Sequence, residues 1–129
     1  MISLSDGATT LTLPDGLLWA DEWTWRAVEQ SVTTTLTGAL VVEVATRQAG
    51  RPITLKSGTD YAWIIRADLD QLNAWADMPG KELALSIRGV SRPVIFRHQD
   101  TAIEAEMILH KSAPAQTDYY QATIRLMEI

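Results

Sequence analysis

The most informative absence in this sequence is cysteine, because none occurs among its 129 residues. The chain therefore has no thiol nucleophile, no cysteine-ligated zinc and no disulfide bond. Its seven glycines are dispersed and do not form a phosphate-binding loop before a helix. No segment approaches the roughly 18 apolar residues of a membrane-spanning helix, and the first residues do not resemble a secretory signal. We expect a protein that is made in the cytoplasm and does not insert into a membrane.

Positive charge is also scarce. The chain has 11 basic and 16 acidic residues, for a net charge of −5. Lys56 and Lys81 are the only lysines between residues 50 and 100, and the arginines are scattered along the sequence. Because nucleic-acid binding depends on clustered Lys and Arg, we do not expect a general nucleic-acid-binding protein. We interpret the net negative charge as a feature that favours solubility and not as a binding site.

The residues that are present indicate one β-rich domain. Apolar residues make up 47% of the chain and charged residues 21%, as in globular proteins, and no linker or repeat divides residues 1–129. Apolar and polar residues alternate along most of the chain, which predicts strands. The expected strands cover residues 9–13, 25–36, 40–48, 53–56, 83–87, 94–96, 103–109 and 120–126, and residues 61–66 form a strand or the approach to a helix.

One helix is expected over residues 68–78. Asp68, with Gln71 three residues later, fits a capping pattern, and Pro79-Gly80 ends the segment. Its apolar face consists of Leu69, Leu72, Trp75 and Ala76. One helix among seven or eight strands predicts a mainly β fold, namely an antiparallel β-sandwich or partly closed barrel with one flanking α-helix.

The alternation also predicts which side chains face the core. The expected inward rows are Val28, Val32 and Leu36 in one strand, then Leu83, Leu85 and Ile87, then Ile103, Ala105, Met107 and Leu109, and finally Tyr120, Ala122, Ile124 and Leu126. Trp63 and Trp75 lie in apolar patterns and are expected to be core or helix-packing residues.

Three further tryptophans, Trp19, Trp23 and Trp25, lie close together ahead of the first long strand. All three are odd-numbered, whereas Val28 and Val32 are even. In a regular strand the tryptophans would face away from the core, unless a bulge intervenes. Two interpretations stay open: the indoles seal one open end of the sandwich, or they contact a second subunit.

Side chains capable of catalysis are few. The one group of residues that resembles a metal site is His98, Asp100, Glu104, Glu106 and His110. The glutamates and His110 also fit the solvent-exposed face of a strand whose other face is buried. No serine lies in a Gly-x-Ser-x-Gly turn. We assign no catalytic, cofactor-binding or metal-binding residue and expect a protein that is not an enzyme. A carbohydrate-binding module that uses the tryptophans as a platform is an alternative.

Several segments together resemble the small tail proteins of long-tailed bacteriophages, most closely the distal tail protein. They are LLWADEWTWRAVEQSVTTTLTGALVVE from Leu17, then GRPITL from Gly50, then YYQATIRLMEI from Tyr119. The resemblance covers most of the chain as an order of elements: paired long strands, a Gly-Arg-Pro turn, a short central helix and a returning sheet.

The resemblance implies a tail-tube-like β-sandwich that forms a homo-oligomeric ring, a hexamer, in the virion tail. Such a ring joins the tail tube to the baseplate hub, binds the proteins of both, and meets DNA only in transit through its lumen. A tail-tube or tail-completion subunit is the alternative within the same class. On this interpretation the candidate subunit-interface residues are Trp19, Trp23, Trp25, Arg26, Arg47 and Arg51.

Overall fold

The computed structural model describes residues 2–129 and contains eleven strands, one α-helix and one short 3₁₀ helix. In chain order these are β1 (Ile2–Ser5), β2 (Thr10–Leu13), β3 (Leu18–Trp19), β4 (Val28–Thr34), β5 (Leu40–Thr46), β6 (Pro52–Lys56), β7 (Ile64–Ile65), α1 (Arg66–Ala76), β8 (Leu83–Ile87), β9 (Val90–Phe96), η1 (His98–Asp100), β10 (Ile103–Met107) and β11 (Tyr119–Glu128). The fold is mainly β, as the sequence predicts.

Nine of these strands form one antiparallel sheet in the order β2-β1-β8-β9-β11-β6-β3, and the long strand β11 organises it. Along one side of β11 run β9 and then β10, separated by the η1 segment. Along its other side run β6 and then β7, separated by the loop of residues 57–63. The sheet is not closed into a barrel, so the sandwich form of the prediction is the one observed.

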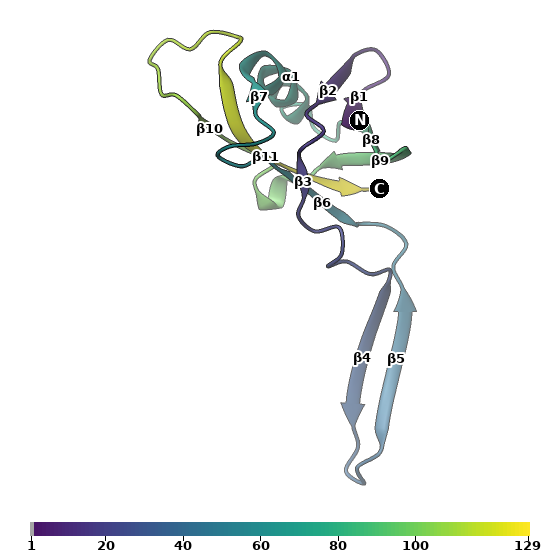
Figure 1. Cartoon of the computed structure of the whole chain (residues 1–129). Helices are drawn as coiled ribbons and strands as arrows, with labels where there is room; N and C mark the ends of the chain where they lie inside the picture. The colour runs from purple at the N-terminus through teal and green to yellow at the C-terminus, as the bar shows by residue number, and fades with distance from the viewer. Residues whose placement is uncertain (1) are drawn as a thin grey trace.

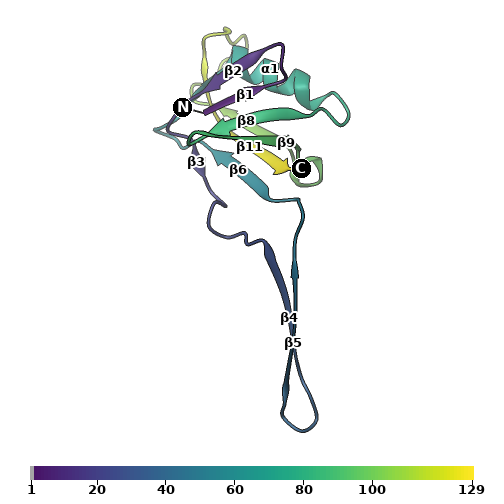
Figure 2. The same cartoon turned by 90° about the vertical axis from the view of Figure 1, so that its right-hand side faces the viewer.

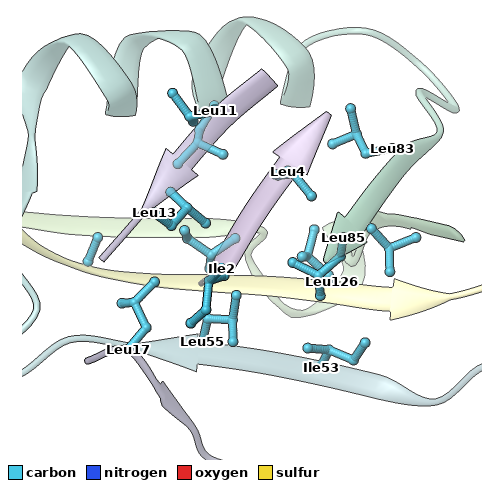
Figure 3. Packing of buried hydrophobic residues seen from close by; sticks show 14 of the residues in the cluster. Ile2, Leu4, Leu11, Leu13, Leu17, Ile53, Leu55, Leu83, Leu85 and Leu126 are labelled. Atoms are coloured by element: carbon cyan, nitrogen blue, oxygen red, sulfur yellow. The ribbon is translucent and has the colours of Figure 1, made fainter. Parts of the chain in front are cut away.

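The core lies between the β1, β2 and β8 part of the sheet and the β6 and β11 part (Figure 3). Leu4, Leu85 and Leu126 have no exposed surface. Two of the predicted inward rows, that of β8 and that of β11, are confirmed as buried along their whole length. Alternate residues of a strand point to opposite faces, so one apolar row on each strand suffices to build this core.

Helix α1 packs beside β1 and β2 at the end of the sandwich (Figure 1). Leu69, Leu72 and Trp75 are buried, as predicted, and the Trp75 indole N–H donates to Oδ2 of Asp6 at 3.2 Å. The predicted cap at Asp68 is wrong, because the residue before the helix is Ile65 and no side chain caps it. The chain enters α1 directly from β7, and the first helical N–H groups donate instead to backbone carbonyls of residues 118 and 116.

The row predicted for residues 103–109 is only partly correct. Ile103 and Met107 are half-buried, whereas Ala105 and Leu109 are exposed. In the part of the chain that the structure describes, β10 pairs with β11 alone, so its far edge has no neighbouring strand. Strand β10 ends at Met107, and Leu109 already belongs to a loop.

Strands β4 and β5 pair only with each other and project from the rest of the molecule (Figures 1 and 2). We call residues 28–46 the arm, and the remainder the body. Every residue of both arm strands is exposed. The expectation that Val28, Val32 and Leu36 face the core is therefore wrong. The pairing that the alternation predicts is present, but no layer within the described residues 2–129 covers it.

Within residues 2–129 no helix is both long enough and apolar enough to cross a membrane.

Candidate functional site

The arm has two chemically different faces. The register pairs Val32 with Val42 and Ser31 with Glu43, and partners directly opposite each other point to the same side. One face therefore carries Val28, Gln30, Val32, Thr34, Leu40, Val42, Val44 and Thr46. The other carries Glu29, Ser31, Thr33, Val41, Glu43 and Ala45. The first, which we call the apolar face, has no charged residue, while both arm glutamates lie on the second, the acidic face.

The apolar face is unusually exposed for its composition. Val32 is 54% exposed, Leu40 63% and Val44 62%. A two-stranded hairpin without a covering layer is at best marginally stable in water, and a contiguous apolar surface of this kind is typical of a protein contact. Covering each half-exposed aliphatic side chain would contribute about 1 kcal/mol. The arm thus has the composition of a strand pair that a second molecule covers.

The three clustered tryptophans lie where the arm meets the body, in a segment we call the root (residues 19–27 and 47–51). Trp19 belongs to β3 and is 7% exposed, Trp25 is half-buried, and Trp23 is 76% exposed. The even-odd comparison with Val28 fails because residues 20–27 are turns and irregular backbone, not strand. Trp19 seals the end of the core and has little surface left to offer a partner, whereas Trp23 is exposed.

Arginines surround the two inner tryptophans. The Arg51 guanidinium lies 4.8 Å from the Trp19 ring centroid and 5.8 Å from that of Trp25, which Arg47 also approaches at 5.8 Å. Sequence reasoning missed Arg88 and Arg92, which lie 5.8 and 5.6 Å from the Trp19 ring. Cations over an indole are attracted by its π face. Arg47 and Arg51 therefore pack within the root, while Arg88 and Arg92 connect Trp19 to the β8 and β9 part of the body.

Hydrogen bonds and ion pairs complete the root. Arg51 donates to the Glu22 carbonyl at 3.0 Å, and Arg88 pairs with the Glu22 carboxylate. Asp21 accepts from both the N–H and the hydroxyl of Thr54 at 2.9 Å. The remaining candidate, Arg26, donates to the carbonyls of Trp23 and Trp25 at 2.9 and 3.0 Å and so orders the loop itself. The arm is consequently joined to the body by an organised segment.

The residues of the two alternative sites, a metal site and a carbohydrate platform, are not arranged for those functions. His98 lies in η1, outside the strands, and His110 approaches only Glu106, at 3.9 Å between Nε2 and Oε1. Among residues 2–129 no group of three or more His, Asp or Glu side chains is placed to hold a metal ion. Trp19 is buried and Trp25 lies beneath arginines, so the clustered indoles do not present a shared flat platform to a sugar.

Fold and site together define a mainly β domain with a projecting hairpin whose apolar face is uncovered. No family model, curated protein or solved structure matches the chain. The functional interpretation therefore depends on the arm, the root and the resemblance of the sequence segments.

Proposed function

We propose that the chain is a structural subunit of a phage tail, a distal tail protein whose copies form a ring between the tail tube and the baseplate hub. The observation that carries the proposal is the arm. Its apolar face is uncharged and exposed, and among residues 2–129 no part of the body covers it. In this role the arm of each copy lies on the next copy, and the chain acts through contacts without catalysing a reaction.

The arm leaves one end of the body, where a neighbouring copy can reach it (Figure 2). In the proposed ring, each arm contacts a different part of the next copy. Such a heterologous contact repeats from copy to copy and closes when the rotation between neighbours divides a full turn. Six copies is the number that the resemblance implies.

The charges suit passage of DNA through such a ring. The chain carries a net charge of −5, and the arm glutamates lie on the face opposite the proposed contact. Since phosphate binding needs clustered basic side chains, an acidic ring does not retain DNA in transit.

Electron microscopy of the purified full chain tests ring formation. We expect closed rings with a central opening, abolished by Val32→Lys, which places a charge in the apolar contact. The matched control is Thr33→Lys, one residue along the same strand but on the acidic face, and it should leave the rings intact. Monomers at tens of micromolar wild-type chain, or equal effects of the two substitutions, would contradict the proposal.

Position in the virion needs a second experiment. Gold-labelled antibodies against the chain should mark the tip of the tail on intact phage particles. Label along the whole tail would instead indicate the tail-tube subunit, and particles without label would refute a role in the virion.

A further inference from the structure

The tip of the arm presents a single large apolar side chain. Leu36 is fully exposed, while its neighbours in the turn are threonines and Gly38. The turn is well ordered: the Thr35 N–H donates to the Ala39 carbonyl at 2.8 Å, and the Thr35 hydroxyl accepts from the Ala39 N–H at 3.1 Å. A leucine held out by an organised turn loses little conformational freedom on binding, so it is suited to anchor the arm in a pocket.

The opposite end of the body contains a pocket of about 170 Å³ between two loops. Its apolar wall consists of Trp63, Ile108, Leu109 and Tyr119. Leu109 is 69% exposed and Tyr119 53% exposed, although both are large and apolar in character. The loop of residues 108–118 that carries part of this wall lies across the body from the arm in Figure 1.

The pocket is rigid enough to receive a side chain. The rings of Trp63 and Tyr119 contact each other at a centroid distance of 5.8 Å, and the Trp63 indole N–H donates to carbonyls of Gly58 and Thr59. The Ile108 N–H donates to the Tyr119 carbonyl at 3.2 Å, which fixes the start of the loop. Tyr119 itself belongs to β11 and pairs with β7.

The polar atoms at the rim already have partners. Lys111 Nζ lies 3.0 Å from Oδ1 of Asp118, and Oδ2 of Asp118 accepts from the Ala115 N–H at 2.8 Å. A polar or charged ligand would have to displace these bonds, whereas an apolar side chain would leave them in place. A water molecule occupies about 30 Å³ of the liquid. A carbon with its hydrogens is of similar size, so the four side-chain carbons of leucine, on the order of 120 Å³ together, fit the pocket.

We propose that Leu36 of one copy inserts into the Trp63–Tyr119 pocket of the next copy, a contact that rests on the ring proposed above. The tip and the pocket lie at opposite ends of the folded molecule (Figure 1), so each copy offers a tip to one neighbour and a pocket to the other. This contact sets the spacing and direction of the subunits, and the apolar face of the arm lies along the intervening surface.

Disulfide cross-linking tests the contact sharply, because the chain has no cysteine of its own. A Leu36→Cys chain is mixed with a Leu109→Cys chain and oxidised. Both positions are exposed, so neither substitution disturbs the core, and tip and pocket are too far apart within one chain to form the bond. The matched control pairs Leu36→Cys with Met78→Cys, another exposed apolar position outside the pocket.

We expect a disulfide-linked pair of chains from the first mixture and little from the control. A chain with both substitutions should give a ladder of linked copies that ends at the ring. In addition, Leu36→Ala should weaken association at least tenfold, as expected for loss of a buried leucine, and Leu36→Met should largely preserve it.

The outcomes separate the two proposals. Intact rings without cross-linking above the control, or links chiefly between two Leu36→Cys chains, would overturn the tip contact and leave the ring standing. Absence of any oligomer would overturn the ring and, with it, this contact.

Discussion

The body and the arm contain the same kind of sequence pattern, but the apolar rows are buried in the body and exposed in the arm. In the body, the alternating rows of β8 and β11 face other rows of the same chain and are buried. In the arm, β4 and β5 also alternate, yet each of their residues is exposed. An amphipathic strand predicts that one face will be covered. It does not predict whether the same chain or another one covers it.

The two regions also differ in what their polar groups do. In the body, the buried hydroxyl of Ser57 pairs with strand β11 of the same chain, since it donates to the Ala122 carbonyl at 3.0 Å and accepts from the Ala122 N–H at 2.5 Å. In the arm, the outer edges of β4 and β5 have no strand beside them among residues 2–129. Free edges present unpaired backbone N–H and C=O groups with which another chain can pair.

The largest expected effect comes from removing the arm. Ala27 and Arg47 face each other at the root, where the Arg47 N–H donates to the Ala27 carbonyl at 2.6 Å, so an Asn-Gly turn can replace residues 28–46. We expect complete loss of assembly, seen as a monomeric mass by light scattering, with the melting temperature of the dilute body changed by only a few degrees. An unfolded body would show that the arm is part of the fold.

A matched pair of truncations sharpens the comparison. Leu126 in the core has no exposed surface, whereas Val42 in the arm is 46% exposed. Leu126→Ala should lower the free energy of unfolding by about 3 kcal/mol, and Val42→Ala should change it by less than about 0.5 kcal/mol in the dilute monomer. Urea titrations at low protein concentration measure both. Similar losses for the two variants would mean that the arm is packed within the monomer.

A smaller effect concerns acid stability of the body. The Thr9 and Ala8 N–H groups, which donate to Oδ1 of Asp6 at 2.7 and 3.0 Å, hold the pKa of that carboxyl below its ordinary value of 3.8. A carboxyl with a lowered folded pKa stabilises the fold above the unfolded pKa and loses that contribution as pH falls through the folded one.

Asp6→Asn should therefore reduce the stability of the body near neutral pH, and the difference from wild type should shrink below about pH 4. Asp118, whose pKa is lowered chiefly by its hydrogen bond from Lys111, titrates in the same direction but is present in both chains. Thermal melts of the two chains across this range provide the comparison. A difference that stays constant down to strongly acidic pH would rule out the carboxylate as its source.

Much of the body could be predicted because its pattern and its packing agree. The β8 and β11 rows and the helix face of Leu69, Leu72 and Trp75 follow from periodicity alone. The prediction from the parity of the tryptophans is conditional on a regular strand, and that condition does not hold because residues 20–27 are turns and irregular backbone. Arg88 and Arg92 could not be placed at the root in advance. Their approach to Trp19 depends on the tertiary arrangement of β8, β9 and β3, which the periodicity of the sequence does not encode.

Hydrogen exchange of the arm in the assembled full chain tests the central claim most directly, namely that a second copy covers residues 28–46. At concentrations where rings form, the arm amides should exchange slowly, and on dilution to monomers they should exchange rapidly while the core strands of the body stay protected. Rapid exchange of the arm within intact rings would contradict the account, because the ring would then be held together by another surface.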